Sequence, residues 1–429
     1  MRFDQAVAEL DLRQPEHMPE PDLERIRALA ALLNDPQLAY PTVHVTGTNG
    51  KTTTARLCAG LACEGGITTG LFTSPHLLAV TERLVVCGEP IGPEEFGQEF
   101  ERLLPYIRNV DERIGAVTYF EVLTALAYLW FADKPVGLGV FEVGMGGTWD
   151  ATNLVAGDVA VICPVGLDHP ELGPTVADVA REKAGIIKQG KVAVVREQTP
   201  DALEQIEWRC DEQFATLLLE ERDWAVRERA PALGGQVFAV RGLHRTYADL
   251  HLPLYGAFAA RNAAAAVVAL EALLERALDE DLARGALAGA SSPGRLEVVA
   301  RHPLIVFDGA HNPAAADSLS GALPEAFAWD RLHLVIATFA NKDLEGIIAA
   351  LAPLADAGYA GTTDSVRARP ASEVAKALIA NGVATQTFPD VETALGAARE
   401  HAGERDLILV TGSLYTVADA RRALLGASG

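Results

Sequence analysis

The sequence is poor in cysteine, and its few cysteines form no recognisable pattern. None of them lies in a Cys-x-x-Cys pair. The five are Cys58, Cys63, Cys87, Cys163 and Cys210. An odd, scattered set argues against a disulfide framework and against a cysteine zinc site, and it favours a reducing cytosol.

Long apolar runs are also lacking. Residues 1–10 have no apolar core of the kind that a signal peptide carries. The longest apolar stretch, near residues 122–132, falls short of the roughly 20 residues that a membrane span needs. We interpret it as a buried helix, and we expect a cytoplasmic protein with no membrane partner.

Positive charge is in short supply. The chain has 36 Lys and Arg against 58 Asp and Glu, which gives a net charge of -22. Such a field repels nucleic acid and anionic membranes, so we expect neither as a partner. A polyanionic ligand would have to be held by backbone N–H groups and a few placed cations. Taken alone, the acidity is typical of a soluble protein.

The chain is long enough for two or three domains, at roughly 150 residues each. Its first half alternates between β-rich runs and helix-like segments. The runs are 42–46, 136–143, 158–165 and 191–195, and the helical segments are 52–64, 119–132 and 175–187. This alternation predicts a parallel sheet that is covered by helices on both faces.

The pattern changes at about residue 202. Short alternating runs at 236–240 and 246–252 predict extra antiparallel strands, and an Ala-rich helix follows over 262–274. Residues 291–294, Ser-Ser-Pro-Gly, predict a hinge. Strands are then expected at 304–307, 332–338 and 407–410. We therefore predict a P-loop NTPase-like, mainly parallel α/β domain over 1–292, and a smaller Rossmann-like α/β domain over 293–429.

A glycine-rich loop joins the first predicted strand to a helix. It consists of Gly47, Thr48, Asn49, Gly50, Lys51 and Thr52. Its glycines let backbone N–H groups face phosphate oxygens, and the helix N-terminus adds partial positive charge. Lys51 can reach the outer phosphates, and the Thr52 hydroxyl suits Mg²⁺. The strict pattern has Gly where this chain has Val45, and the plain alternative is a turn that only caps a helix.

The chain resembles the folylpolyglutamate synthase and dihydrofolate synthase family, within the Mur ligase superfamily. The resemblance covers nearly the whole chain and rests on motifs in order. They lie at residues 46–52, 71–77, 81–84, 88–91, 119–121, 142–147, 150–153, 166–169, 181–186, 293–295, 308–313, 341–343 and 411–413. The resemblance implies an ADP-forming ligase that adds L-glutamate to folate or dihydropteroate.

The resemblance also implies site residues in the first domain. It implies that the loop, with Thr53, binds ATP, that Ser74 and Glu142 bind a first Mg²⁺ together with Thr52, and that His169 helps to bind a second. Lys183 is expected to carry a carbamate that bridges to Mg²⁺, and a monovalent cation is a further expected ligand. Without the resemblance, Ser74 is a turn residue, His169 a helix cap and Lys183 an exposed helix charge.

The remaining implied residues serve the nucleotide and the glutamate. Asn262 and Asp308 are expected at the adenosine, and Arg295 at the phosphates. Arg83, His311 and Ser413 are candidates for the incoming glutamate, with Lys51, Lys183 and His311 in catalysis. The alternative for Arg83 is a surface charge.

Two departures from the family stand out. The family has Gly-x-His-Gln-x-x-Asn before the Ala-rich helix, whereas this chain has Phe258 and Ala259 in place of His and Gln. Polar groups that could orient Asn262 are therefore missing. The family also more often has Gly-Lys-Gly-Ser where this chain has Gly50-Lys51-Thr52-Thr53, which resembles the cell-wall ligases.

We expect a monomer in which ATP converts a carboxylate into an acyl phosphate that the glutamate amine attacks. The two domains would close across the hinge. The rival enzyme is a Mur ligase acting on a UDP-sugar peptide, and residues 73–76 and 181–186 favour the folate branch. A non-catalytic ATP-binding regulator is the rival outside catalysis.

Overall fold

The computed structural model describes residues 1–15, 22–167 and 170–426, and within these the chain forms two compact units. The first comprises Met1–Arg229, Phe238–His251 and Arg261–Ala290. The second comprises Ala230–Val237, Leu252–Ala260 and Ser291–Gly429. The division into domains at residue 293 stays a prediction.

An eight-stranded sheet forms the centre of the first unit, in the order β4-β3-β2-β5-β1-β6-β7-β8. Six strands, from β2 to β8 in that order, run parallel, and β3 and β4 add an antiparallel hairpin at one edge. The strands are β1 Thr42–Thr46, β2 Thr69–Phe72, β3 Leu84–Val86, β4 Glu89–Pro90, β5 Leu138–Glu142, β6 Val159–Ile162, β7 Val192–Val195 and β8 Thr216–Leu219.

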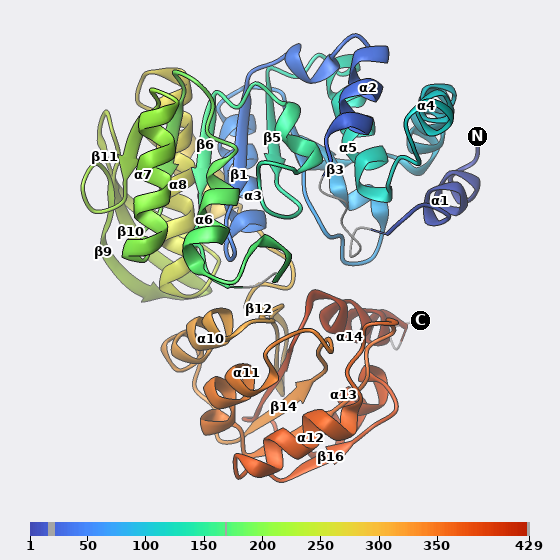
Figure 1. Cartoon of the computed structure of the whole chain (residues 1–429). Helices are drawn as coiled ribbons and strands as arrows, with labels where there is room; N and C mark the ends of the chain where they lie inside the picture. Colours follow the sequence, from blue (N-terminus) through green and yellow to red (C-terminus); the bar gives the residue numbers. More distant parts are fainter. Residues whose placement is uncertain (16–21, 168–169, 427–429) are drawn as a thin grey trace. The chain divides into compact units, whose positions relative to one another are not determined.

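The inner strands of this sheet are buried because helices pack against it. Every residue of β1 and β5 is buried, as expected of parallel strands between helical layers. In Figure 1, α1, α2, α4 and α5 lie toward the β3 end of this sheet, and α6 and α7 lie toward its β6 end. The helices are α1 Phe3–Asp11, α2 Glu24–Leu32, α3 Lys51–Glu64, α4 Pro93–Arg113, α5 Tyr119–Asp133, α6 Val176–Ala184, α7 Pro200–Glu212 and α9 Glu280–Ala288.

Short 3-10 turns occupy Pro36–Leu38, Val80–Arg83, Ala151–Leu154 and Pro170–Leu172. The two predicted extra strands are confirmed as β10 (Gly235–Arg241) and β11 (Thr246–Leu252). They form a separate three-stranded sheet with β9 (Ala225–Ala232), which the sequence did not predict. Helix α8 (Ala257–Leu274) follows it and begins five residues before the predicted start. Asn262 therefore lies inside this helix.

The second unit holds a six-stranded sheet in the order β12-β13-β17-β14-β15-β16. All neighbours are parallel except β12 and β13. Its strands are β12 Glu297–Arg301, β13 Leu304–Phe307, β14 Leu332–Ile336, β15 Ala357–Ala360, β16 Thr385–Thr387 and β17 Leu407–Thr411. Its helices are α10 Pro313–Ala326, α11 Leu344–Leu351, the 3-10 turn Ala352–Leu354, α12 Ala371–Ala380, α13 Val391–His401 and α14 Leu414–Gly426. The predicted α/β fold class is confirmed in both units.

The expectation from the cysteines needs a correction. The structure joins Cys63 and Cys87 in a disulfide, and Cys58, Cys163 and Cys210 are free and buried. The two partners meet because β2 and β3 pair in antiparallel fashion, which brings Cys87 beside Thr69, just beyond the end of α3. The 24-residue separation hid this pairing in the sequence.

Among the described residues, one helix is long and apolar enough to cross a membrane. It is α8, not the stretch at 122–132 that the sequence singled out. Two thirds of its apolar window, 67%, is buried inside the protein. Helices in the core of a soluble protein have the same length and composition, so α8 is weak evidence for a membrane span.

Candidate functional site

The glycine-rich loop occupies the turn between β1 and α3, as predicted. Gly47 and Gly50 have φ values of 144° and 93°, in the region that glycine adopts without strain. A Cβ on Gly47 would lie 2.6 Å from the Cβ of Cys163, and one on Gly50 would lie 2.9 Å from Oδ1 of Asn262. Both glycines are therefore required by close approach as well as by backbone conformation.

The Lys51 side chain folds back across this loop. Its Nζ donates to the carbonyl oxygens of Gly47 at 3.0 Å and Thr48 at 3.3 Å. Thr48 in turn holds the loop to the segment after β6, because its hydroxyl donates to the Gly166 carbonyl at 2.8 Å and accepts from the Gly166 amide at 2.9 Å. The loop is thus fixed at several points by its own chain.

Thr52, Glu142 and Ser74 meet at the carboxyl ends of neighbouring parallel strands. The Thr52 hydroxyl donates to Oε1 of Glu142 at 2.7 Å, and the Ser74 backbone amide donates to Oε2 at 3.1 Å. Glu142 ends β5 and is 1% exposed. This edge is where open α/β sheets bind ligands, and the three residues expected at a first metal lie together there.

Lys183 is buried, so it is not an exposed helix charge. It lies in α6 with 3% exposure, and its Nζ donates to the Gly47 carbonyl at 2.9 Å. Lys51 donates to the same oxygen. Two lysine amino groups therefore converge on one carbonyl of the phosphate loop.

The second metal ligand, His169, lies outside the described residues. Within the part of the chain that the structure describes, no three His, Cys, Asp or Glu side chains gather as a metal-binding group. The first expected site contains one carboxylate, Glu142, with hydroxyl groups beside it. Gln198 braces the segment that leads toward His169, since its amide donates to Cys163 O at 3.1 Å and accepts from Val165 N at 2.9 Å.

Arg83 is also buried, which excludes the surface-charge alternative. It is 2% exposed, its Nε donates to Nδ1 of His76 at 2.9 Å, and its guanidinium lies 5.5 Å from the Tyr119 ring centroid. Its place is beside Thr73, at the carboxyl end of β2, because its carbonyl accepts from the Thr73 amide. Its expected role toward glutamate stays a prediction.

Asn262 has a partner that the sequence did not reveal. Oδ1 of Asn262 accepts a short hydrogen bond from Arg196, which is 2% exposed and pairs with Glu220 at 3.0 Å. Burial tends to raise the pKa of Glu220, but Arg261 and Arg196 outweigh it and lower that pKa. Arg196 follows β7 at the same edge as Ser74 and Glu142, and that position was the signal that could have identified it. Asn262 is therefore oriented by a side chain that follows another strand, although Phe258 and Ala259 offer it no polar group.

In the second unit, Asp308 and His311 follow β13, and Ser413 follows the neighbouring strand β17. Asp308 accepts from the amides of Leu296 at 2.7 Å and Ala310 at 2.8 Å, so it shapes the turns on both sides of it. Burial raises the pKa of Asp308, although the nearby charge of Arg295 opposes the effect.

The other two second-unit residues also contact neighbouring groups. Nδ1 of His311 lies 2.8 Å from the Gly309 carbonyl. Ser413 caps α14, since its hydroxyl accepts from the Thr416 amide at 3.0 Å. The structure thus places His311 and Ser413 at one sheet edge within this unit.

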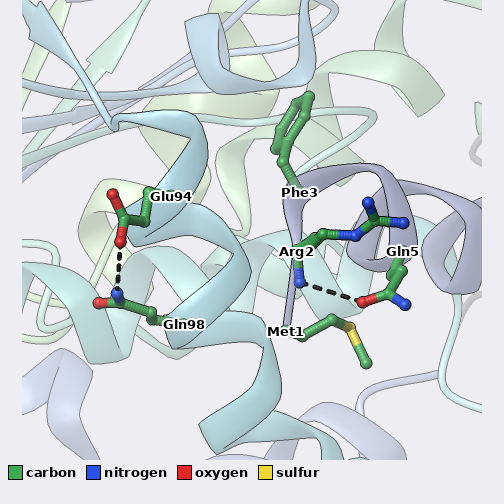
Figure 2. Close-up of a pocket in the computed structure, with 6 residues that line it drawn as sticks. All are labelled: Met1, Arg2, Phe3, Gln5, Glu94 and Gln98. Atoms are coloured by element: carbon green, nitrogen blue, oxygen red, sulfur yellow. Dashed lines mark hydrogen bonds between the residues drawn. The ribbon is translucent and has the colours of Figure 1, made fainter.

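One surface recess in the described residues lies away from these groups. It measures about 650 Å³ and is lined by Met1, Arg2, Phe3, Gln5, Glu94 and Gln98, as Figure 2 shows. None of these is a predicted site residue. The recess lies where the start of α1 meets α4, and it has no chemistry in common with the phosphate loop.

Comparison with known proteins fits this arrangement. Residues 45–270 match the Mur ligase middle domain, and residues 294–414 match the Mur ligase glutamate ligase domain. The dihydrofolate synthase/folylpolyglutamate synthase of Mycobacterium tuberculosis is 38% identical over 97% of this chain and 92% of that protein.

Two solved structures are similar over almost their full length. Folylpolyglutamate synthase of Mycobacterium tuberculosis, complexed with ADP, has a TM-score of 0.94 at 37% identity, covering 99% of this chain and 98% of that one. The bifunctional enzyme from Yersinia pestis, complexed with AMPPNP and Mn ion, has a TM-score of 0.88 at 31% identity, covering 99% and 98%. The chain therefore belongs to the dihydrofolate synthase and folylpolyglutamate synthase family of ADP-forming ligases, within the Mur ligases.

Proposed function

We propose that this protein uses ATP to join the amino group of L-glutamate to a carboxylate of dihydropteroate or of a folate. One observation carries the proposal beyond family membership. Lys51, Thr52, Glu142 and Ser74 converge at the carboxyl edge of one parallel sheet, directly at a loop shaped for phosphate. We also infer a cytoplasmic monomer.

The nucleotide is assigned to the phosphate loop. The amides of Thr48 and Asn49 donate to the Pro164 carbonyl at 2.9 and 3.4 Å, so within residues 47–53 the phosphates are assigned to the amides nearer the start of α3. The Lys51 ammonium neutralises charge that develops as the γ-phosphoryl group moves to the acceptor carboxylate. The resulting acyl phosphate is a far better electrophile than the carboxylate. Asn262, Arg295 and Asp308 are assigned to the rest of the nucleotide.

The residues at the end of β5 fit a divalent cation. Carboxylate and hydroxyl oxygens are the hard ligands that Mg²⁺ prefers, and Glu142, Ser74 and Thr52 supply them within one hydrogen-bonded cluster. When bound, the ion would shield phosphate charge beside Lys51. His169 is assigned to a second ion, and the monovalent cation stays a proposal without an assigned ligand.

We assign a carbamate to Lys183. Two lysine amino groups that donate to the Gly47 carbonyl repel each other when both are charged. Reaction of the neutral Lys183 amine with CO₂ forms an N–C bond and releases a proton, which leaves an anionic carbamate. The change replaces repulsion toward Lys51 with attraction and adds an oxygen ligand near the proposed metal.

Glutamate is assigned to Arg83, His311 and Ser413. The amine of glutamate attacks the acyl phosphate, and phosphate leaves from the tetrahedral intermediate. His311, with one ring nitrogen near the Gly309 carbonyl, is the residue that we assign to this step.

The experiment that tests the proposal is ADP release measured with ATP, Mg²⁺ and glutamate, with each of three acceptors. Dihydropteroate, tetrahydrofolate and a UDP-sugar peptide are compared, and product masses are recorded. We expect ADP release only with glutamate and a pterin acceptor, with a mass increase of one glutamyl residue. Ligation to the UDP-sugar peptide alone, or ATP binding without ligation, would reject the proposal.

A further inference from the structure

Arg367 lies against a pair of aromatic rings, Phe339 and Tyr415, in a loop at the carboxyl edge of the second unit's sheet. Its guanidinium carbon lies 4.2 Å from the ring centroid of Phe339 and 5.7 Å from that of Tyr415. Within residues 1–15, 22–167 and 170–426 it has no carboxylate partner. In a protein with a net charge of -22, a fixed guanidinium without an acidic partner calls for an explanation.

Its position follows from the order of the strands. The neighbours β13, β17, β14 and β15 are parallel, so the loops that follow them lie side by side along the carboxyl edge. These loops carry His311, Ser413, Phe339 and Arg367, respectively. Ligands bind at this edge in open α/β sheets.

Hydrogen bonds tie the four loops to one another. The Gly412 amide donates to the Ala310 carbonyl at 3.1 Å, the Thr416 hydroxyl to the Ala337 carbonyl at 2.8 Å, and the Ala340 amide to the Arg367 carbonyl at 2.9 Å. Arg367 is therefore fixed relative to Ser413 by structure within a single unit.

The same edge contains buried hydroxyl groups without a partner. Oγ1 of Thr411, at the end of β17, and Oγ1 of Thr338, just beyond β14, are fully buried and make no hydrogen bond. A buried polar group without a partner among the described residues is uncommon in a folded protein, and both lie beneath this edge of the sheet. Ser413 also places the N-terminus of the 13-residue helix α14 here, where anions are favoured.

The stacking leaves the binding edge of Arg367 available. Aromatic rings contact the face of a guanidinium, whereas its N–H groups point outward in the plane, where a carboxylate binds bidentately. Phe339 and Tyr415 also reduce the side-chain entropy that Arg367 would lose on binding. We propose that Arg367 binds a carboxylate of the incoming L-glutamate, an inference that rests on the proposed function.

The test is steady-state kinetics of Arg367→Gln and Arg367→Ala with dihydropteroate as the acceptor. This acceptor carries no glutamate, so an effect cannot come from glutamyl residues that are already attached. Loss of a charged, bidentate contact should raise KM for glutamate about 10- to 100-fold. The KM values for ATP and dihydropteroate, and kcat, should change less than about threefold, because Arg367 does not contact those groups.

Arg405→Ala is the matched control. Arg405 belongs to the same unit, is 83% exposed, pairs with Asp330, and precedes β17 at the opposite edge of the sheet. It should leave every constant unchanged. Arg367→Lys retains a stacked cation for folding, yet one ammonium cannot replace two in-plane donors, so KM for glutamate should still rise.

Glutamate analogues identify which carboxylate is held. Glutamine lacks the γ-carboxylate and the α-amide of glutamate lacks the other, and each is used as a competitor. Arg367→Ala should weaken the binding of glutamate, but it should not change the inhibition constant of the analogue that lacks the contacted carboxylate. An unchanged KM for glutamate, or an equal rise in all three KM values, would overturn the proposal. A wild-type enzyme without glutamate-dependent ADP release would instead reject the proposed function.

Discussion

The hydroxyl of Thr52 donates to Oε1 of Glu142 at 2.7 Å, which links the first turn of α3 to the end of β5. The other carboxylate oxygen accepts from the Ser74 amide at 3.1 Å, just beyond β2. One side chain therefore connects the segments that follow three neighbouring strands, β1, β5 and β2. Each carboxylate oxygen of Glu142 has a defined donor, so a substitution at Glu142 disturbs known contacts.

Glu142→Gln should weaken the response to Mg²⁺. Glutamine can keep the contact with the Ser74 amide through its oxygen and donate to the Thr52 hydroxyl through its NH2 group, but it loses the negative charge and one of the two oxygen ligands. We expect the Mg²⁺ concentration for half-maximal activity to rise about 10- to 100-fold. Glu345→Gln, at an exposed position in α11, is the control. An unchanged Mg²⁺ requirement would remove Glu142 from the metal site.

Lys51→Ala should abolish most of the turnover. The ammonium is positioned by the carbonyls of Gly47 and Thr48 to act on the phosphates, so its loss removes transition-state stabilisation. We expect kcat to fall by about 100- to 1,000-fold, with KM for glutamate little changed. Lys376→Ala, an exposed lysine in α12, should behave as wild type. Near-normal turnover of Lys51→Ala would overturn the assignment.

The carbamate on Lys183 should be detectable. Protein equilibrated with isotopically labelled CO₂ should show a carbamate carbonyl signal by NMR, and Lys183→Ala should lack it. The variant should be nearly inactive, and acetate should restore part of the activity by supplying a carboxylate in the vacated space. Since mass spectrometry in acid releases CO₂, the NMR signal is the decisive measurement. A fully active Lys183→Ala enzyme contradicts this prediction.

Arg196→Met should reduce both stability and nucleotide affinity. It leaves Glu220 buried with Arg261 and the Glu197 amide as remaining partners, and we expect the free energy of unfolding to fall by about 3 kcal/mol. It also frees the Asn262 side chain, so Kd for ADP, measured by calorimetry, should rise.

The double variant with Asn262→Ala separates these two effects. Because both changes remove one contact, their effects on Kd should not add. Arg227→Met, which breaks an exposed pair with Glu221, is the control. Additive losses of ADP affinity would show that Arg196 does not act through Asn262.

Lys188 should make stability depend on pH above neutrality. It is partly buried near Asn153, with Nζ bonded to the Asn153 carbonyl at 2.8 Å and its Oδ1 at 2.7 Å. Burial, with the charges of Arg209 and Arg27, lowers the pKa of Lys188 to about 8 from 10.5. Between these values the unfolded chain binds more protons than the folded one, so this residue's contribution to stability rises with pH.

Lys188→Met isolates that contribution. The free energy of unfolding of wild type minus that of the variant, from denaturant titrations, should increase from pH 8 to pH 10 and stay flat from pH 6 to pH 7.5. Tyr and other Lys groups that titrate in both proteins cancel in this difference. A difference that stays flat over the alkaline range would mean that the pKa of Lys188 is not lowered, and one that falls would mean that it is raised.

The sequence was a good guide wherever apolar periodicity and a strand end coincided. The strands at 42–46, 246–252 and 304–307 have the predicted bounds, because each is a β-rich run closed by turn residues. The predicted strand at 136–143 is shorter in the structure, where β5 spans Leu138–Glu142, although the Val143 amide still donates to the Val45 carbonyl of β1. Residue type cannot separate a buried turn residue from a strand residue.

The contacts among side chains were the part that sequence could not give. Arg196 and Asn262 are 66 residues apart, and Cys63 and Cys87 are 24 apart, so only the order of strands brings each pair together. Arg83 and Lys183 illustrate the same limit. A charged residue in a polar segment looks exposed unless the neighbouring elements are known, and both of these are buried.

The two hydrogen bonds between Thr48 and Gly166 have a consequence for the thermodynamics of nucleotide binding. They hold the phosphate loop in its curled conformation before any ligand arrives, so the ordering of this segment is a part of folding. An incoming triphosphate then meets amides that already point in fixed directions. The affinity of the loop for phosphate is therefore not reduced by the entropy cost of ordering a flexible chain.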